Sequence, residues 1–182
     1  MINISSRSQL NELLEYYNLP KIVVEVGVAE GRYSQEMLAW NLEKLYLVDI
    51  WEEVPFITGC ASFPKKWHDD NYESVKKVQE QSNGVVEILK GFSHDKSKEV
   101  PDESCGLIYI DGDHTYEGCK TDIKYWLPKL VQGGVMAFHD YANPTYGVGR
   151  AVNEYCSANE IEVIRILENN HIENIGAYFI KK

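Results

Sequence analysis

The sequence lacks several features that would place it in a specialised class. It has no apolar run near the roughly 18 residues that cross a bilayer, and its first ten residues lack the apolar core of a signal peptide. None of its 4 cysteines belongs to a C-x-x-C pair, so neither a zinc site nor a redox motif is indicated. We therefore expect a cytoplasmic protein without a membrane partner.

Positive charge is also scarce. The chain has 18 Lys and Arg against 28 Asp and Glu, a net charge of −10, and its short basic clusters are flanked by acids. Such a surface repels phosphate backbones, so we expect no nucleic-acid partner. A length of 182 residues suits one domain with one core, so we predict a single domain over 1–182.

Hydrophobic patterning alternates between short β-branched runs and helical spacing. The predicted helices are an N-terminal one within 1–20 and others over 32–40, 67–81, 115–130 and 146–158. The predicted strands are 21–28, 44–50, 85–90, 105–110, 135–138, 162–167 and 174–180. Alternation of this kind predicts an α/β fold with a mostly parallel sheet and helices on both faces. The last connection is too short for a crossover helix, so the final two strands should be antiparallel.

The turn after the first predicted strand has the spacing E-x-G-x-x-x-G, formed by Glu25, Gly27 and Gly31. Glycines there allow a tight turn and close approach of a ligand, and the following helix start suits a carboxylate or phosphate. Ala29 and Arg32 stand where a dinucleotide fingerprint needs glycine, and the acids would repel pyrophosphate. A ligand with an amino group beside a carboxylate, such as a methionine moiety, fits better. An ordinary strand–helix turn is the alternative.

Asp49 ends the second predicted strand, 18 residues after Gly31. An acid at this position can accept hydrogen bonds from both hydroxyls of a ribose. A solvated acid at a strand end is the alternative. Together with the glycine turn, Asp49 favours binding of an adenosine-type ligand.

Acids and histidines follow the fourth and fifth predicted strands: Asp111, Asp113 and His114 after one, His139 and Asp140 after the other. If these strands are neighbours, the side chains converge at the edge of the sheet where ligands bind in open α/β folds. A divalent cation would offset the concentrated charge, with magnesium preferred and calcium or manganese as alternatives. Asp113 as a helix cap and His139 as a packed histidine are the alternatives without a ligand.

Four stretches together resemble the family-24 class I methyltransferases. They are the glycine turn, Asp49-Ile-Trp51, the run YIDGDHTYEGCKTD over 109–122 and the run GGVMAFHDY over 133–141. The group is similar to macrocin-type sugar O-methyltransferases and, more distantly, to catechol and caffeoyl-CoA O-methyltransferases. The resemblance implies a Rossmann-like, seven-stranded sheet in the order 3-2-1-4-5-7-6 with strand 7 antiparallel. It also implies S-adenosylmethionine as cofactor.

The resemblance implies roles for single residues. Gly27 and Gly31, with Glu25 and Asp111 nearby, would line the methionine end of the cofactor, and Asp49 would hold the ribose. The adenine would lie among Ile50, Trp51, Gly91, Phe92 and Ser93. Asp111 and Asp140 match metal-ligand positions, and His139 stands where the metal-dependent relatives often carry an acid. His114 matches a general base, with Asp113 as a second catalytic candidate, and residues 51–66 match a substrate lid.

The expected function is therefore metal-assisted methylation of a hydroxyl on a small-molecule acceptor, by a chain that can form a homodimer. Two alternatives stay open. One is a non-catalytic module of the same fold that binds S-adenosylmethionine or S-adenosylhomocysteine. The other is an NAD-dependent oxidoreductase, which Ala29 and Arg32 disfavour.

Overall fold

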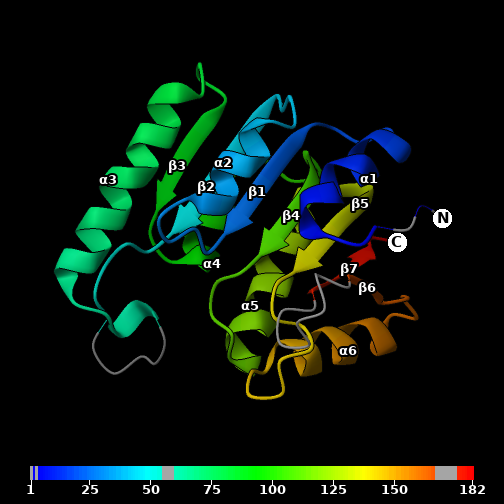
Figure 1. Ribbon diagram of the computed structural model, residues 1–182. Helices are drawn as coiled ribbons and strands as arrows, with labels where there is room; N and C mark the ends of the chain where they lie inside the picture. Colours follow the sequence, from blue (N-terminus) through cyan, green and yellow to red (C-terminus); the bar gives the residue numbers. More distant parts are fainter. Residues whose placement is uncertain (1, 3, 55–59, 167–175) are drawn as a thin grey trace.

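A computed structural model describes residues 2, 4–54, 60–166 and 176–182. Its sheet has seven strands in the order β3-β2-β1-β4-β5-β7-β6, as predicted (Figure 1). Neighbouring strands are parallel except where β7 pairs with β5 and with β6. The strands are β1 (Ile22–Val26), β2 (Lys44–Asp49), β3 (Val86–Lys90), β4 (Cys105–Ile110), β5 (Leu130–Phe138), β6 (Ile164–Ile166) and β7 (Gly176–Ile180).

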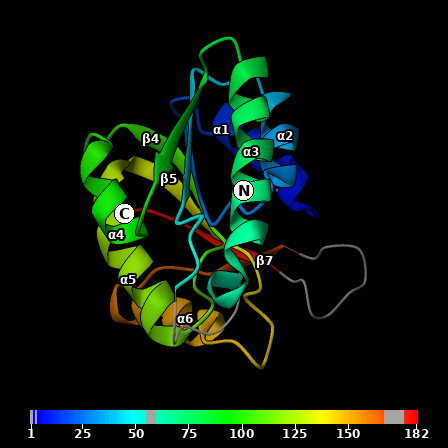
Figure 2. The same ribbon diagram turned by 90° about the vertical axis from the view of Figure 1, so that its left-hand side faces the viewer.

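Helices cover both faces of the sheet, as Figure 2 shows nearly edge-on. One face carries α1 (Leu10–Tyr16), α2 (Arg32–Leu38) and α3 (Lys65–Gln81). The other carries α4 (Ser93–Lys96), α5 (Tyr116–Trp126) and α6 (Val148–Ala158). Short 3-10 helices are η1 (Arg7–Gln9), η2 (Cys60–Ser62), η3 (Ser97–Glu99) and η4 (Leu127–Lys129). Within the described residues, no helix is long and apolar enough to cross a membrane.

The central strands are apolar on both sides because both of their faces are covered. On β4, Leu107 and Tyr109 face the layer of α1 to α3, whereas Ile108 and Ile110 face the layer of α5 and α6. Alternate residues of one strand therefore belong to two different hydrophobic clusters. This explains why the strands appear in the sequence as continuous apolar runs without polar alternation.

The start of β5 differs from the prediction, which placed a helix over 115–130 and the strand at 135–138. In the structure α5 ends at Trp126 and the strand already begins at Leu130. Cys105 pairs with Leu130 and Leu107 with Val135, so β5 holds extra residues in a bulge. Gly133 has a φ of 78°, a conformation that suits such a bulge and that glycine adopts without strain.

Three predicted segments extend beyond the described residues. The predicted lid over 51–66 includes 55–59, and the two last predicted strands include 167 and 174–175. The described parts of those two strands form β6 and β7 with the predicted antiparallel pairing.

Candidate active site

The carboxyl ends of β1, β2, β4 and β5 lie at one edge of the sheet, so the predicted site residues share a region (Figure 1). Gly27 is in closest contact there: with a φ of 85°, a Cβ on it would lie 2.1 Å from the carbonyl oxygen of Asp111. The Asp111 N–H donates to the Val26 carbonyl at 2.7 Å. The ends of β1 and β4 therefore touch through their backbones, and only glycine fits between them.

Asp49 holds the turn after β1 in place. Its Oδ2 accepts hydrogen bonds from the backbone N–H groups of Val28 at 2.8 Å and Ala29 at 2.9 Å. Its Oδ1 accepts one from the Trp51 N–H at 3.2 Å. The residue predicted to bind a ribose is therefore also the acceptor that fixes the glycine turn.

Trp51 is buried, with 2% of its surface exposed, although it was predicted to flank an adenine. Its indole N–H donates to the Ala29 carbonyl at 2.8 Å, and its ring lies 5.2 Å from the Tyr72 ring. Ile50 beside it is partly buried. A pocket of about 500 Å³ opens next to these residues, lined by Trp51, Glu52, Glu53, Lys65, Asp69 and Lys90. Trp51 thus packs beneath the pocket surface and links it to the turn after β1.

Glu25 points into the layer between β1 and α2. Only 2% of its surface is exposed, and its Oε2 accepts a short hydrogen bond from the Ser34 hydroxyl. Burial raises the pKa of Glu25 to about 8, because the ionised carboxylate loses its hydration. Glu25 therefore lies beneath the glycine turn rather than on its surface.

The turn Gly91-Phe92-Ser93 follows β3 and was predicted to contact adenine. The Phe92 side chain is 47% exposed at this edge. Ser93 points the other way: its hydroxyl donates to Asp122 Oδ1 at 2.5 Å and accepts from the Trp126 indole at 2.7 Å. Burial raises the pKa of Asp122 to about 7. Sequence reasoning missed this link to α5; its signal was an aspartate among apolar positions of one helical face.

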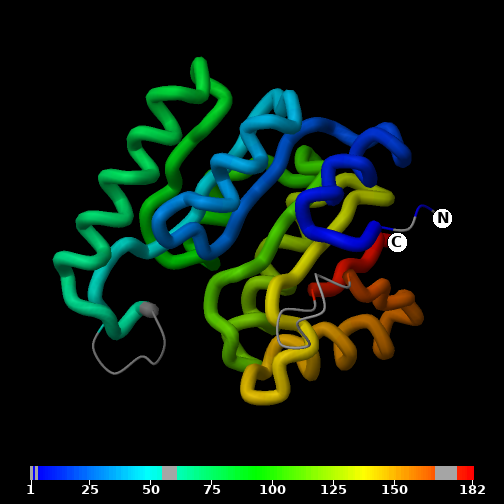
Figure 3. Tube along the Cα trace, in the orientation of Figure 1, coloured from blue at the N-terminus to red at the C-terminus, as the bar shows by residue number. Residues whose placement is uncertain are grey.

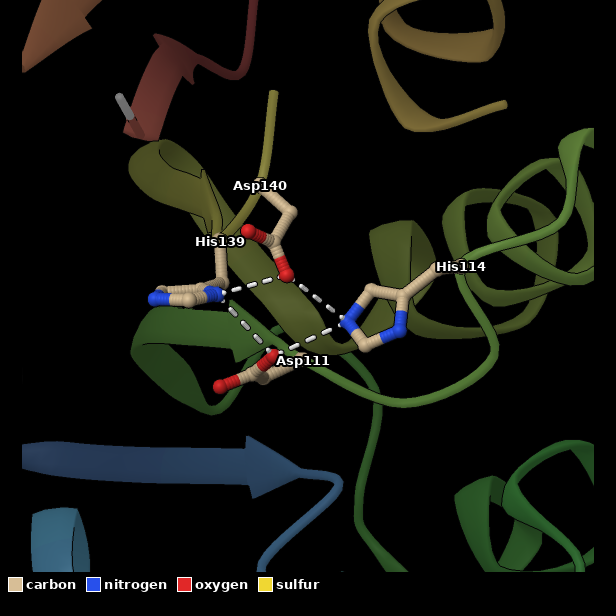
Figure 4. Close-up of side chains that lie close together, drawn as sticks. All are labelled: Asp111, His114, His139 and Asp140. Carbon is tan, nitrogen blue, oxygen red and sulfur yellow. Dashed lines mark hydrogen bonds and ion pairs between the residues drawn. The ribbon is translucent and has the colours of Figure 1, made fainter. Parts of the chain in front are cut away.

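Asp111, His114, His139 and Asp140 converge on one point, as Figure 4 shows. One ligand atom from each residue lies within 4.8 Å of all the others. His114 Nε2 lies 3.1 Å from Asp111 Oδ1 and 3.3 Å from Asp140 Oδ2. His139 Nδ1 lies 3.4 Å and 2.9 Å from the same two oxygens. The predicted meeting of the two strand ends is confirmed in these distances.

His139 supplies the test of whether a metal ion fits this cluster. Its Nδ1 is buried and makes no hydrogen bond of good geometry, although carboxylate oxygens of Asp140 and Asp111 lie 2.9 Å and 3.4 Å from it. Neighbouring donors 2.9 to 3.4 Å apart suit adjacent ligands of one ion with bonds of about 2.1–2.4 Å. The residues present therefore fit a divalent cation.

The carboxylates also alter the two imidazoles. Burial alone would lower the pKa of His114, but its hydrogen bond to Asp111 and the nearby negative charges outweigh burial and raise it. Burial alone would also lower the pKa of His139, but the carboxylates of Asp140 and Asp111 outweigh burial and raise it. Asp140 adopts a φ of 52°, a left-handed conformation that turns its side chain back toward the cluster.

Asp113 lies outside the cluster. Its Oδ1 accepts from the Thr115 N–H at 2.9 Å, and a Cβ on Gly118 would come within 2.3 Å of its carboxyl carbon. Thr115 in turn caps α5 through Gly118. This geometry argues against the predicted catalytic role, because the exposed Asp113 carboxylate is used to start the helix.

Tyr146 was not predicted, yet it fixes His114. Its ring stacks on the imidazole with centroids 4.7 Å apart and planes 15° from parallel. The Gly147 N–H donates to the His114 carbonyl at 2.8 Å, so the loop before α6 holds both the backbone and the ring. The signal in the sequence was an aromatic residue beside glycine after the second acidic strand end.

A profile described as a methyltransferase domain, Methyltransf_24, matches residues 24–141, which include both acidic strand ends and the glycine turn. The chain belongs to this methyltransferase family. The membership confirms the predicted resemblance and favours methyl transfer over the oxidoreductase alternative. The cofactor residues named above stay predictions.

Solved methyltransferases share the fold. The O-methyltransferase NovP is 21% identical, with 96% of this chain and 77% of that chain covered and a TM-score of 0.66. CalS11, a TDP-rhamnose 3'-O-methyltransferase of calicheamicin biosynthesis, is 17% identical. The match covers 97% of this chain and 81% of CalS11, with a TM-score of 0.65. An O-methyltransferase from Bacillus cereus, solved in complex with SAH, is 13% identical. The match covers 100% of this chain and 83% of that chain, with a TM-score of 0.69. Identities this low establish the fold alone.

One curated relative is Uncharacterized protein y4gI of Sinorhizobium fredii (strain NBRC 101917 / NGR234), 27% identical over 135 residues. The match covers 71% of this chain and 14% of the relative, so the chain spans a small part of that protein's length.

Proposed function

We propose that this domain transfers the methyl group of S-adenosylmethionine to a hydroxyl oxygen of a small acceptor, assisted by a divalent cation. The observation that carries the proposal is the convergence of two carboxylates and two imidazoles at the carboxyl edge of β4 and β5, within a methyltransferase fold. NovP and CalS11, which share the fold, are described as O-methyltransferases, which supports oxygen as the methylated atom.

The cofactor would lie over the ends of β1 and β2. Gly27 lets the ends of β1 and β4 meet at the first turn, which brings Asp111 beside the proposed cofactor site. Asp49 Oδ1 carries one long hydrogen bond, so it retains capacity to accept from a ribose hydroxyl. The exposed ring of Phe92 is suited to cover an adenine at the neighbouring strand end.

Asp111, His139 and Asp140 would hold the cation. Imidazole nitrogen is a poor ligand for magnesium, which prefers oxygen, whereas manganese and other first-row transition ions accept mixed nitrogen and oxygen sets. The His139 Nδ1, which has no hydrogen bond, therefore favours manganese or a similar ion over the magnesium that the acids after the two strands led us to expect.

A divalent ion held in this position would lower the pKa of an acceptor hydroxyl bound to it. His114 Nε2 faces the same point and would accept the proton of the acceptor hydroxyl. Tyr146 would keep the imidazole in that orientation through its stacked ring. Alignment of the acceptor oxygen with the methyl group would then allow in-line displacement.

Thermal unfolding with S-adenosylhomocysteine, manganese and magnesium tests the proposal. At about 100 times its Kd, S-adenosylhomocysteine should stabilise the protein by about 2.7 kcal/mol, and manganese should stabilise it more than magnesium at equal concentration. His139→Asp should lower the ratio of manganese to magnesium affinity. Asp113→Asn, a carboxylate outside the cluster, should leave both metal effects unchanged.

The absence of S-adenosylhomocysteine binding would refute the cofactor. Metal effects that persist in an Asp111→Asn, Asp140→Asn double variant would refute the metal site. Binding of S-adenosylhomocysteine without metal binding, and without methylation of a panel of hydroxyl acceptors, would instead support the non-catalytic binding module.

A further inference from the structure

A chain of buried hydrogen bonds joins the turn after β3 to α5. The Trp126 indole N–H donates to the Ser93 hydroxyl oxygen at 2.7 Å, and the Ser93 hydroxyl donates to Asp122 Oδ1 at 2.5 Å. An indole N–H can only donate and a serine hydroxyl has one proton, so the direction of both bonds is fixed. Asp122 is only 4% exposed, and Trp126 is fully buried. The Asp122 carboxylate is therefore the acceptor on which this chain of bonds ends.

The second oxygen of the same carboxylate reaches the turn after β4. A Cβ on Gly112 would lie 3.6 Å from Asp122 Oδ2, so the carboxylate lies beside the backbone next to Asp111. In the strand order β3-β2-β1-β4, three strand spacings, about 14 Å, separate β3 from β4. Figure 3 traces the green tube from β3 to the yellow-green coil of α5. One buried side chain of α5 thus contacts the turns on either side of the proposed cofactor site.

The anchored Ser93 hydroxyl determines where the Phe92 ring points. Phe92 has an extended backbone, with φ −63° and ψ 134°, and neighbouring side chains of an extended segment project in opposite directions. Because Ser93 points inward to Asp122, the Phe92 ring stays at the surface, where it is 47% exposed. This is the ring proposed above to cover an adenine.

A carboxylate at this buried position costs the folded protein free energy. Burial raises the pKa of Asp122 to about 7, and the hydrogen bond from Ser93 offsets only part of the rise. The ionised group is therefore less stable here than in water, and an apolar side chain would fill the same space without this cost. Packing of α5 alone does not account for an acid at this position.

We propose that Asp122 is a positioning residue for the adenosine half of the cofactor, because it fixes the turn after β3 so that the Phe92 ring covers the adenine. The inference rests on the proposed function, since it assumes that S-adenosylmethionine binds over the ends of β1 and β2. Asp122 lies beneath the turns and acts through Ser93. A turn that is held in place before binding spares the ligand the entropy cost of ordering it.

Calorimetry with two ligands tests this role. The ligands are S-adenosylhomocysteine and methylthioadenosine, which keeps the adenosine and sulfur but has no amino-acid part. Asp122→Ala should weaken both by about 3- to 10-fold, the scale of one aromatic contact, because both carry the adenine. Ser93→Ala removes the same link and should give the same losses, so it carries the test if Asp122→Ala does not fold. Asp122→Asn keeps an acceptor oxygen for Ser93 and should stay within about 2-fold of wild type.

A double-mutant cycle separates positioning from support of the fold. Phe92→Ala alone should weaken both ligands by a similar factor, and adding Asp122→Ala or Ser93→Ala to it should weaken them by less than about 2-fold further. Cys156→Ala removes a buried side chain of α6 and is the control for lowered stability. It should leave both affinities unchanged.

Three outcomes would contradict these expectations. Losses that add fully in the double variants would show that Asp122 does not act through Phe92, and would overturn the proposal. Loss of S-adenosylhomocysteine affinity alone would mean that Asp122 supports the turn of Asp111 instead, and would also overturn it. Wild-type protein that binds neither ligand would refute the proposed function itself.

Discussion

The two halves of the sheet's carboxyl edge differ in how their polar groups are paired. At the ends of β1 and β2, Asp49 accepts three backbone hydrogen bonds and the Trp51 indole is satisfied by a carbonyl. At the ends of β4 and β5, the buried Nδ1 of His139 has no hydrogen-bond partner although carboxylates surround it. The first half uses its polar groups to fix the backbone, whereas the second contains a buried ring nitrogen without a hydrogen bond.

This difference suggests how the fold and the site share their residues. In the half around Asp49, side chains predicted to bind the cofactor also determine the shape of the turn, so mutations there should affect stability before any ligand is added. In the half around His139, the four side chains contact one another and do not fix a backbone turn as Asp49 does, so mutations should act more on ligand binding than on stability. The following predictions test this division.

Gly27→Ala should have the largest effect. The new Cβ would overlap the Asp111 carbonyl at 2.1 Å, a backbone atom that cannot move without separating β1 from β4. We expect a loss of about 3 kcal/mol or more in the free energy of unfolding, measured in urea. Gly84→Ala is the matched control, because its φ of 86° is nearly the same and nothing lies within 4 Å of the added Cβ.

The control should lose only about 1 kcal/mol, the cost of a left-handed conformation. The difference between the two variants measures the close approach of the strands. Equal losses would show that conformation alone accounts for Gly27, and that β1 and β4 need not touch.

The same substitution in each half compares the two directly. Asp49→Asn replaces one accepting oxygen by an NH₂ group, so a backbone N–H such as that of Trp51 loses its acceptor. The free energy of unfolding should fall by about 1–2 kcal/mol in the absence of ligand. Asp140→Asn keeps the left-handed conformation that asparagine tolerates, and should change stability by less than about 0.5 kcal/mol. The Asp140 variant should, however, lose stabilisation by manganese. The reverse order of stabilities would contradict the comparison.

Glu25→Gln should make stability less dependent on pH. The folded protein holds the pKa of Glu25 at about 8, against an ordinary 4.5, so the unfolded chain releases this proton first as pH rises. The contribution of Glu25 to the free energy of unfolding is therefore greatest below about pH 4.5, and it decreases as the pH rises to about 8. Glutamine can still accept from Ser34, so the variant should gain about 1–3 kcal/mol relative to wild type across that window.

Urea unfolding of both proteins from pH 5 to 8 measures this gain. A constant difference at every pH would mean that Glu25 is ionised in the folded state. The Arg7 guanidinium would then be its natural counter-charge.

Tyr146→Ala should have the smallest effect on stability, about 0.5–1.5 kcal/mol for the lost ring stacking. Its larger consequence should be functional, because His114 loses the ring that orients it toward Asp111 and Asp140. Tyr146→Phe keeps the stacked ring and is the control. The manganese-dependent rise in melting temperature should fall in the alanine variant and remain in phenylalanine, and a fall in both would assign the effect to the hydroxyl.

The sequence alone determined the fold class and the two groups of polar residues at the carboxyl edge of the sheet, one around Asp49 and one around His139. Continuous apolar runs separated by helical spacing specify buried parallel strands, and the short final connection specifies an antiparallel one, because neither pattern depends on distant residues. The sequence also placed Gly27, Asp111 and Asp140 at strand ends, and the strand order then brings them together. Each lies at the end of a strand whose neighbour the topology fixes.

Only the tertiary structure decided which side chains face the site. Trp51 stands in the predicted adenine motif but points inward to the Ala29 carbonyl, and Ser93 turns to Asp122 on α5. Arg7 reaches Tyr109 across 102 positions of sequence. Such contacts depend on the order of the strands and the packing of helices between them. Residue spacing along the chain carries no information about these, because a side chain's direction is set by the partners that bury it.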